Sequence, residues 1–312
     1  MANESLRGAY GKTLLKLGQE NRDIVVLDAD LAKSTQTQLF AKQMADRFID
    51  MGLSEQDMVS TAAGIALTGK TVFASSFCVF LAGRVFDQVR QSVCYNDANV
   101  KLVGTHSGLG VGEDGATHQA LEDIALMRSL PNMRLIVPAD ALETAQAIEY
   151  AAAEPGPFFI RLTRNPLPVV HQPDFRFRFG QAEVLRDGGD ITLVAIGAMV
   201  EKALQAADSL AAAGFSAAVI NCSTIKPLDR ETMVSYAAKT RGIVTIEDHS
   251  VYGGLGGAVA ECLAQHCPAR IRIIGVDNRF GCSGTPEELY SQFGLDTAAI
   301  IRESRALLQG RP

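Results

Sequence analysis

The chain has 312 residues, about twice the ~150 residues of a typical domain, so its length predicts two domains. A hydrophobic content of 47% and a charged content of 21% are ordinary for a globular protein and exclude disordered and collagen-like classes. The formal net charge is -6 and the basic residues form no run, so we expect no nucleic-acid partner.

The sequence also lacks the features of a membrane or secreted protein. No apolar stretch approaches the ~20 residues of a membrane span, and the first residues do not form a signal-peptide pattern. The six cysteines include no Cys-x-x-Cys pair, which predicts reduced, free thiols. We therefore expect a cytoplasmic protein that is not associated with a membrane.

Short β-branched runs alternate with longer segments of helical period through the first half of the chain. Strands that are almost entirely apolar and alternate with helices indicate a parallel sheet that helices cover on both faces. The expected strands cover residues 24–27, 71–73, 101–103, 134–137 and 158–160. The expected helices cover residues 6–18, 55–68, 81–96, 119–129 and 140–152.

The alternation stops where Pro166, Pro168 and Pro173 interrupt any helix or buried strand, and it then resumes. The fold class is therefore α/β, with two three-layer domains built on mainly parallel sheets. We place the first domain at residues 1–170, a linker at 171–182 and the second domain at 183–312. The expected strands of the second domain cover residues 191–196, 217–220, 242–246 and 271–276, and the expected helices cover 200–213, 230–239, 254–266, 286–292 and 297–308.

A polar loop follows the expected strand 101–103. It holds His106, Glu113, Asp114 and His118 among several glycines. Open parallel sheets bind their ligands at the carboxyl ends of the strands, which is where this loop lies. Two imidazoles and two carboxylates suit proton transfer and the recognition of hydroxyl groups. We therefore expect a functional loop, the alternative being a solvated polar turn.

Gly110, Gly112 and Gly115 of this loop match the spacing of the dinucleotide-binding fingerprint. That fingerprint opens a helix within the first strand–helix–strand unit, which is not the position found here. In addition, Glu113 and Asp114 lie inside the loop, where they would repel a pyrophosphate. The glycines therefore do not predict nucleotide binding.

The segment 54–57 has the pattern of a capping box, with Ser54 at the N-cap and Asp57 three residues later. Glu55 then falls at the first helical position, where the helix dipole favours a carboxylate. Taken alone, this segment indicates only the start of a helix.

Two further segments are explained by packing. Phe73, Phe77 and Phe80 form an aromatic run after a strand, for which burial in a core is the usual role. The glycine-rich segment 253–257 predicts close packing of a helix on the sheet. An anion site at the N-terminus of that helix is the alternative.

Several of these segments, taken together in chain order, form a pattern that is more specific than any one of them. Gly52-Leu-Ser-Glu55-Gln-Asp-Met58 fits a Gly-x-x-Glu-(Gln/His)-x-Met signature, and Gly110-Val-Gly-Glu-Asp114-Gly-Ala-Thr-His118 fits Gly-x-Gly-Glu-Asp-Gly-x-x-(His/Gln). Between them lies Ser76-Phe77-Cys-Val-Phe80, and Val251-Tyr-Gly-Gly-Leu-Gly-Gly-Ala follows them. With this order and spacing, the chain resembles the thiamine-diphosphate-dependent transketolase family over nearly all of its 312 residues.

The resemblance implies the pyrimidine-binding and C-terminal domains of a transketolase. In the family, another domain carries a Gly-Asp-Gly motif and a downstream Asn that hold Mg²⁺ and the diphosphate, and this chain contains no Gly-Asp-Gly. The chain therefore resembles the C-terminal subunit of a split transketolase. A separate N-terminal subunit would hold Mg²⁺ and the diphosphate of thiamine diphosphate. A homodimer of this chain within a heterotetramer is also implied, because family active sites lie at subunit interfaces.

The resemblance assigns roles toward the cofactor. Glu55 matches the glutamate that hydrogen-bonds N1′ of the aminopyrimidine, and Asp30 matches a residue close to the cofactor in the second active-site subunit. Phe77 and Phe80 match the aromatic residues around the pyrimidine. This chain has one residue more than some family members between Phe80 and the next arginine, so Phe73 or Leu81 remains an alternative for one of these places.

The resemblance also assigns roles toward the substrate. His118 would face the reacting carbonyl oxygen and move protons, and Asp114 would bind a hydroxyl near the bond that is cleaved. His106 matches a polar residue that contacts the substrate. Positions that bind the phosphate of a sugar phosphate are matched by Arg7, Ser34, His106 and Arg164.

The function implied is transfer of a two-carbon ketol unit between sugar phosphates. Alternatives are the β subunit of a 2-oxoacid dehydrogenase, a 1-deoxyxylulose-5-phosphate synthase and a non-catalytic regulatory subunit. His106, Asp114 and the arginines and serine of the phosphate set favour transketolase, because 2-oxoacids carry no sugar phosphate. Intact Glu55, Asp114 and His118 argue against a non-catalytic subunit. The sugar stays open among pentose phosphates, apulose 4-phosphate and sulfosugars.

Overall fold

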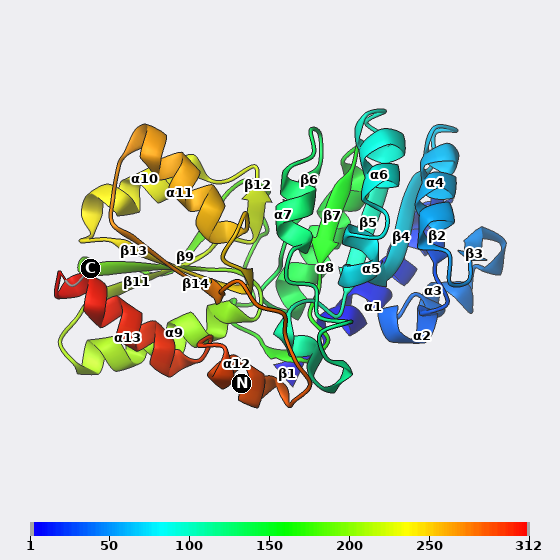
Figure 1. Cartoon of the computed structure of the whole chain (residues 1–312). Coiled ribbons are helices and arrows are strands. Elements are labelled where there is room, and N and C mark those ends of the chain that lie inside the picture. Colours follow the sequence, from blue (N-terminus) through cyan, green and yellow to red (C-terminus); the bar gives the residue numbers. More distant parts are fainter. Residues whose placement is uncertain (1–2, 311–312) are drawn as a thin grey trace.

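The computed structural model describes residues 3–310. Two α/β domains lie side by side, each with a central sheet between layers of helices (Figure 1). Both sheets are mainly parallel, so the predicted fold class is confirmed. A short antiparallel ladder between β1 (Asn3–Glu4) and β8 (Leu167–Pro168) joins the start of the first domain to its end.

Within residues 3–310, the first domain is built on a seven-stranded sheet with the order β12-β6-β7-β5-β4-β2-β3. Its strands run parallel except β12, which comes from the second half of the chain and pairs antiparallel with β6. The strands are β2 (Ile24–Asp28), β3 (Phe48–Asp50), β4 (Thr71–Phe77), β5 (Val100–Thr105), β6 (Arg134–Ile136), β7 (Phe158–Arg161) and β12 (Thr224–Lys226).

Helices cover both faces of this sheet, because successive residues of a strand point to opposite faces and both sets are apolar. Val26 and Phe73 enter the core on one face, whereas Leu27 and Ala74 enter the core on the other. The first face is covered by α1 (Leu6–Glu20), α3 (Gln38–Ala41) and α8 (Ala141–Ala153). The second is covered by α4 (Glu55–Ala66), α5 (Cys78–Ala82), η2 (Val89–Cys94) and α7 (Asp123–Arg128). Two short turns, α2 (Ala32–Thr35) and η1 (Ala45–Arg47), lie between β2 and β3.

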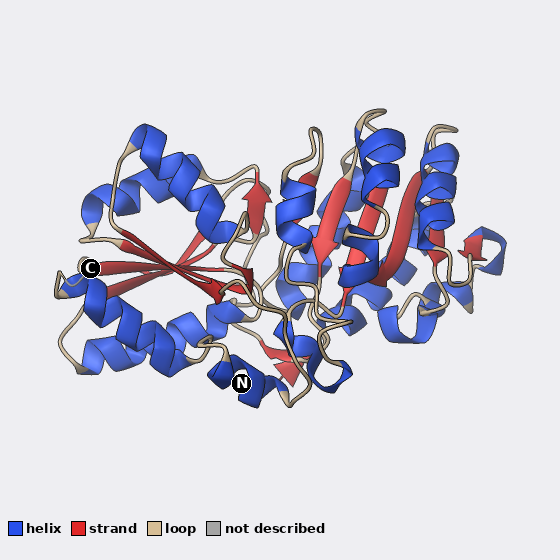
Figure 2. Ribbon diagram, in the orientation of Figure 1, coloured by secondary structure: helices blue, strands red, loops and turns tan. Residues whose placement is uncertain are grey.

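In the described part of the second domain, a five-stranded sheet has the order β14-β13-β10-β11-β9. Figure 2 shows this sheet edge-on, with helices above and below it. The strands are β9 (Glu183–Arg186), which is antiparallel to β11, β10 (Ile191–Ala195), β11 (Ala217–Asn221), β13 (Ile243–Ser250) and β14 (Ile271–Val276). One layer holds α9 (Met199–Ala212), α12 (Pro286–Gln292) and α13 (Thr297–Leu308), and the other holds α10 (Arg230–Lys239) and α11 (Leu255–His266).

The helix expected over residues 81–96 is wrong as a single element. The chain instead forms α5, α6 (Phe86–Gln88) and the π-helical turn η2, with a break after Ala82. Gly83 disfavours a continuous helix at this point. The carbonyl of Arg84 accepts a hydrogen bond from Nε2 of Gln56 (3.0 Å), which ties the break to α4. The other expected helices and strands are present, with ends that differ by up to four residues.

The capping box predicted at residues 54–57 is also wrong. Ser54 is the N-cap residue, but its hydroxyl donates to the carbonyl of Met51 (2.5 Å) and caps no N–H of α4. With φ -140° and ψ 63°, Ser54 directs its side chain back along the chain. The predicted position of Glu55 as the first helical residue is confirmed.

The glycine-rich turn before α11 packs closely, as expected. The N–H groups of Leu255 and Gly256 donate to the buried carboxylate of Glu247 at 2.7 and 2.8 Å. A Cβ atom at Gly254 would lie 1.9 Å from that carboxylate, so glycine is required there. The anion at this helix N-terminus is therefore a side chain of the protein itself. Burial raises the pKa of Glu247 to about 7.

The linker is fixed to α8 by a buried ion pair. Nδ1 of His171 lies 2.8 Å from Oδ2 of Asp140, and both side chains are fully buried. Asp140 also accepts hydrogen bonds from the N–H groups of Val170 (2.9 Å) and Glu143 (2.8 Å), so it holds the linker and caps α8 together. Burial alone would lower the pKa of His171, but the hydrogen bonds to Asp140 and Glu183 raise it to about 10.

Replacing His171 with glutamine is expected to destabilise the fold by about 3–5 kcal/mol, because Asp140 would lose its buried partner. The folded-state pKa of His171 lies above the ordinary 6.5, so the ion pair stabilises fully below pH 6.5 and its contribution is lost as the pH rises toward 10. Urea unfolding of wild type and variant between pH 6 and 10 measures this, with exposed His266→Gln as the control. If the difference in the free energy of unfolding between wild type and His171→Gln stayed constant with pH, it would contradict the assignment of a charged ion pair.

Candidate functional site

The predicted site residues gather at the carboxyl edge of the first sheet. Strands β7, β5, β4, β2 and β3 are parallel neighbours, so the segments that follow them meet at one edge. Arg7, near the start of α1, reaches this edge by hydrogen bonds to two of these segments. The residues that end or follow these strands are Asp30 and Ser34 (β2), Glu55 (β3), Phe77 and Phe80 (β4), His106, Asp114 and His118 (β5) and Arg164 (β7).

Glu55 presents a buried carboxylate at the start of α4. Its side chain is 2% exposed, and its Oε2 lies 2.8 Å from Nη1 of Arg84, whose side chain is 48% exposed. The helix N-terminus and the guanidinium both attract the negative charge of the carboxylate. The pairing with Arg84 was not predicted from the sequence, because it depends on the break between α5 and α6. A carboxylate held in this way can accept a hydrogen bond from a ring nitrogen of a heteroaromatic ligand.

Aromatic rings connect Glu55 to the polar loop. The guanidinium of Arg84 lies over the ring of Phe80, 4.3 Å from its centroid. Phe80 meets His118 edge-on at 5.5 Å, and Phe77 stacks on His106 at 3.7 Å. Phe77 and Phe80 are themselves stacked at 5.9 Å. The structure therefore brings the predicted cofactor-binding aromatics and both predicted catalytic histidines into one cluster.

Phe73 and Leu81, the alternatives to Phe77 and Phe80, are placed elsewhere. Both are fully buried. Phe73 packs near Tyr10, with a ring separation of 6.5 Å, on the face covered by α1 and α8. Leu81 belongs to the core on the opposite face of the sheet. Neither side chain is available to a ligand at the carboxyl edge.

Two arginines form the cationic part of the site. Arg7 donates to the carbonyl oxygens of Ser34 (Nη1, 2.6 Å) and Arg164 (Nε, 3.1 Å). Arg164 donates to the carbonyl of Val111 (2.6 Å), and its Nη1 lies 3.5 Å from Oδ2 of Asp114. Burial and the charge of Arg164 lower the pKa of Arg7. Two adjacent, partly buried guanidinium groups suit an anion with several oxygens, such as phosphate.

His106 lies buried beside these charges. Burial, and then the charges of Arg7 and Arg164, lower the pKa of His106 to about 3. Its Nδ1 is 2.9 Å from the hydroxyl of Thr105, which orients the ring. His106 is therefore neutral at physiological pH and offers one hydrogen-bond donor and one acceptor.

Proton titration of His106 is expected to show a neutral ring down to about pH 4. Its pKa is lower in the folded chain than the ordinary 6.5, so the unfolded chain binds more protons and stability falls as the pH drops from 6.5 toward 3. Arg7→Gln should raise the pKa of His106. Histidine-labelled NMR spectra, assigned with His106→Gln, measure both effects, and titration of wild-type His106 near pH 6.5 would contradict them.

Asp30 lies at the same edge but is exposed, with a left-handed φ of 59°. Its N–H donates to Oδ1 of Asp50 (3.0 Å). The buried Asp28 orders this loop by accepting hydrogen bonds from the N–H of Leu31 (2.7 Å) and the hydroxyl of Thr35 (2.7 Å). Burial raises the pKa of Asp28 to about 6. A charged residue at the end of an apolar strand is the sequence signal by which Asp28 could have been identified.

The donor set at this edge fits one part of thiamine diphosphate and not the other. Glu55 offers a buried acceptor and the half-buried Phe80 an aromatic ring, which suit an aminopyrimidine ring. Among residues 3–310, no cluster of three or more His, Cys, Asp or Glu side chains is arranged to hold a metal ion.

All six cysteines are free thiols. Within residues 3–310, no helix is long and apolar enough to cross a membrane.

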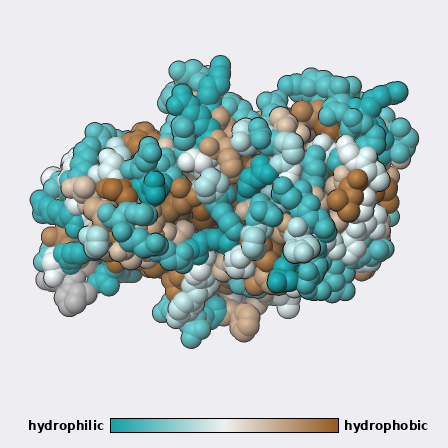
Figure 3. All heavy atoms as spheres, turned by 90° about the horizontal axis from the view of Figure 1, so that it is seen from above, coloured by the Kyte–Doolittle hydropathy of each residue, from teal (hydrophilic) through white to brown (hydrophobic). Residues whose placement is uncertain are grey.

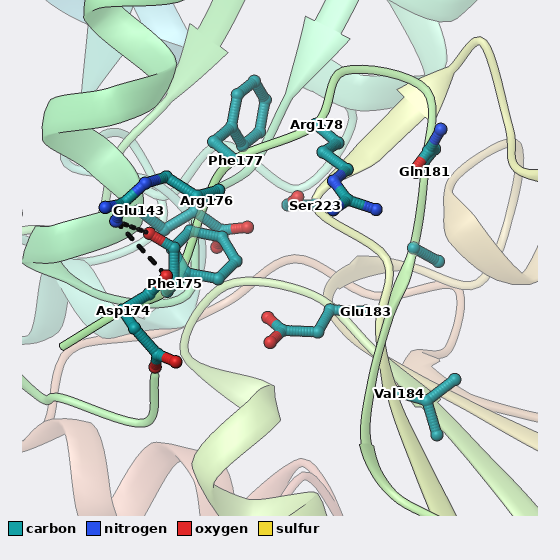
Figure 4. A pocket seen from close by; sticks show the side chains of 11 residues that line it. Glu143, Asp174, Phe175, Arg176, Phe177, Arg178, Gln181, Glu183, Val184 and Ser223 are labelled. Carbon is teal, nitrogen blue, oxygen red and sulfur yellow. Dashed lines mark hydrogen bonds between the residues drawn. The ribbon is translucent and has the colours of Figure 1, made fainter. Parts of the chain in front are cut away.

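A separate cavity of ≈ 410 Å³ lies at the linker (Figure 4). Residues 174–178 line it together with Glu143, Glu183 and Ser223. The carboxylate of Glu143 already accepts hydrogen bonds from Nδ2 of Asn221 (3.1 Å) and the N–H of Ala139 (2.7 Å). The predicted site residues are not among those that line the cavity. The cavity is therefore separate from the candidate site at the carboxyl edge of the first sheet.

Comparison with known protein families finds two domain models that match this chain. The model "Transketolase, pyrimidine binding domain" matches residues 3–169, and "Transketolase, C-terminal domain" matches residues 180–300. The two domains and the polar edge described above are thus those of a transketolase-type α/β protein. The chain belongs to the transketolase family.

Three relatives match along almost their full length. A protein of Methanocaldococcus jannaschii named for a transketolase C-terminal section is 44% identical, over 96% of this chain and 95% of the relative. A 6-deoxy-6-sulfo-D-fructose transketolase subunit of Clostridium sp. is 41% identical, over 97% of this chain and 94% of the relative. A subunit of the apulose-4-phosphate transketolase of Phocaeicola vulgatus is 37% identical, over 97% of both chains.

Solved structures share the fold. A split gene transketolase, described as an inactive beta4 tetramer, superposes with a TM-score of 0.90 at 46% identity and covers 100% of both chains. The transketolase of Campylobacter jejuni gives a TM-score of 0.85 at 22% identity, over 97% of this chain and 47% of that chain. The second likeness concerns the fold alone.

Proposed function

We propose that this chain is the C-terminal subunit of a transketolase that transfers a two-carbon ketol unit between sugar phosphates. The observation that carries the proposal is the placement of Arg7 and Arg164 beside neutral His106, next to the cluster of Glu55, Phe77 and Phe80. An anion-binding group adjoins a buried acceptor and aromatic faces. Such a site suits a phosphorylated sugar that reacts beside a heteroaromatic cofactor.

The residues of this chain have separate tasks in the proposed reaction. The cofactor, when bound, supplies a carbon nucleophile and an electron sink. Glu55 holds the pyrimidine by a hydrogen bond at N1′, and the Phe77–Phe80 pair orients the ring and excludes water. His118 moves a proton at the reacting carbonyl oxygen, with neutral His106 as a hydrogen-bond donor beside it. Asp114 accepts a hydrogen bond from a substrate hydroxyl, and Arg7 and Arg164 bind the phosphate.

The diphosphate and Mg²⁺ are proposed to bind to a separate N-terminal subunit. A diphosphate-bound Mg²⁺ requires a set of oxygen ligands, which the described residues do not supply. The relatives named as transketolase subunits support this division of the cofactor between two chains.

A homodimer of this chain within a heterotetramer is proposed as the working assembly. Seen from above, hydrophobic residues are interspersed with hydrophilic ones on the surface (Figure 3). A large apolar side chain is exposed beside the site, since Leu53, directly before Ser54 and Glu55, is 77% exposed. A partner that covered Leu53 would also cover the neighbouring site. The tetrameric split transketolase structure supports assembly through this kind of chain.

The proposal is tested by reconstitution with an N-terminal transketolase subunit, thiamine diphosphate and Mg²⁺, followed by a panel of ketose donors. The panel contains pentose phosphates, apulose 4-phosphate and 6-deoxy-6-sulfo-D-fructose, because a sulfonate presents anionic oxygens as a phosphate does. Ketol transfer from one of these donors is expected. Decarboxylation of a 2-oxoacid, or the absence of transfer from all donors, would overturn the proposal.

The transketolase names of the relatives favour this function over a 2-oxoacid dehydrogenase subunit, a 1-deoxyxylulose-5-phosphate synthase or a regulatory subunit. The partly buried arginines favour it over a 2-oxoacid dehydrogenase subunit. A 2-oxoacid carries no sugar phosphate, so its site has no need of a phosphate-binding pair of arginines.

A further inference from the structure

The segment between His106 and His118, here called the substrate loop, has little regular structure. It contains the short 3-10 helix η3 (Leu109–Asp114), and its φ angles are positive at Gly108 (65°), Gly112 (82°) and Gly115 (75°). A backbone of this kind keeps one conformation only when its surroundings fix it. The loop supplies Asp114 and the carbonyl oxygen that positions Arg164, so its conformation sets the substrate face of the site.

The second domain holds this loop through one buried carboxylate. Asp248, near the end of β13, accepts hydrogen bonds from the N–H groups of Leu109 (Oδ1, 2.8 Å) and Gly110 (Oδ2, 3.3 Å). The hydroxyl of Tyr290, in α12, donates to the same Oδ2 at 3.0 Å. Asp248 is 5% exposed and Tyr290 is 8% exposed, so water does not compete for these bonds.

The glycines of the loop permit this contact. A Cβ atom at Gly108 would lie 2.2 Å from Oδ2 of Asp248, and one at Gly110 would lie 2.7 Å from the hydroxyl oxygen of Tyr290. Of the three glycines with the spacing of a dinucleotide fingerprint, Gly110 is therefore explained by its close approach to a phenol of the second domain.

A rigid support lies behind Asp248. Nη2 of Arg161, at the end of β7, donates to the carbonyl of Asp248 at 2.9 Å, and its Nε donates to Oδ2 of Asp123 at 2.7 Å. Both side chains of this ion pair are buried, at 3% and 0% exposure. Asp248 is thus fixed through its backbone to the strand that leads to Arg164.

We infer that Asp248 and Tyr290 are positioning residues, through which the second domain sets the substrate loop for binding of the sugar phosphate. The pair does not touch the reacting atoms. It fixes Leu109 and Gly110, and the next residue, Val111, provides the carbonyl that orients Arg164. The expected effect on KM rests on the proposed function. The expected effect on the conformation of the substrate loop does not.

The first experiment compares Asp248→Asn with Asp277→Asn, which removes an exposed carboxylate just after β14. In the wild type, two carboxylate oxygens of Asp248 accept the hydrogen bonds from Leu109, Gly110 and Tyr290. The asparagine side chain has only one acceptor oxygen, so the loop loses a hydrogen bond. Hydrogen–deuterium exchange of residues 107–116 should accelerate about tenfold or more in Asp248→Asn alone. In the reconstituted enzyme, KM for the ketose phosphate should rise about tenfold or more, with kcat changed less and the thiamine diphosphate affinity retained.

The second experiment uses compensation, so it does not depend on the stability of one variant. Gly110→Ala should place a methyl group against the hydroxyl of Tyr290 and raise KM, whereas Tyr290→Phe should change KM less. The double variant Gly110→Ala/Tyr290→Phe should recover part of the loss, because the colliding oxygen is absent. A purely structural defect would lower the melting temperature and the affinity for thiamine diphosphate together with activity.

Unchanged exchange of residues 107–116 in Asp248→Asn would overturn the inference, whatever reaction the enzyme catalyses. Faster exchange with an unchanged KM would overturn the claim that this contact serves substrate binding. If the wild-type complex transfers no ketol unit, the proposed function fails, while the exchange result still decides whether Asp248 holds the loop.

Discussion

Replacing Glu55 with alanine is expected to lower the turnover of the reconstituted enzyme by about 10²- to 10⁴-fold, the usual range for a group that controls proton transfer. The fold should be retained. The partner left behind, Arg84, is 48% exposed and can be hydrated, so the substitution leaves no buried unpaired charge. Steady-state ketol transfer at saturating cofactor and circular dichroism of the isolated chain measure the two expectations.

The matched control is Asp57→Ala, which removes an exposed acid from the first turn of the same helix. Its turnover should stay within about threefold of wild type, because surface substitutions away from a site have small effects. Should Glu55→Ala also stay within that range, the assignment of Glu55 to the cofactor is wrong.

Replacing Arg7 with glutamine is expected to raise KM for a phosphorylated donor roughly 10- to 100-fold, since hydrogen bonds to a charged group contribute about 1.5–3 kcal/mol. For an unphosphorylated ketose, kcat/KM should fall less than about threefold, because this substrate presents no anion to the guanidinium. The ratio of kcat/KM for the two donors therefore measures the effect directly. Arg164 is less suitable for this test, because its bond to the Val111 carbonyl also shapes the substrate loop.

Exposed Arg22→Gln serves as the control for the change in net charge and should leave the ratio unaltered. If Arg7→Gln lowered kcat/KM equally for both donors, Arg7 would support the segments around Ser34 and Arg164 and would not bind phosphate.

Most of the fold could be predicted because it is encoded in local patterns. Apolar runs such as residues 24–27 and 101–103 have the length and composition of buried parallel strands, and the structure confirms them. Strand β12 could not be predicted. It is a three-residue segment of the second half of the chain that completes the sheet of the first. Its place depends on packing between distant segments, which periodicity does not report.

The placement of the candidate site residues was predictable to a similar extent. Glu55 begins a helix and His106 follows a strand, as expected. The contacts that hold them were not predictable, because their partners are far apart in sequence. Asp248 and Leu109 are 139 positions apart, and Arg84 reaches Glu55 only because the expected helix breaks. No spacing in the sequence reports either pair.

Calorimetric titration of thiamine diphosphate and Mg²⁺ tests the central claim most directly. We expect no saturable binding to the isolated chain at ligand concentrations up to about 1 mM, and binding at least a hundredfold tighter once an N-terminal transketolase subunit is added. Glu55→Ala should weaken the binding seen in the mixture. Tight binding to the isolated chain would contradict the claim that a second protein holds the diphosphate.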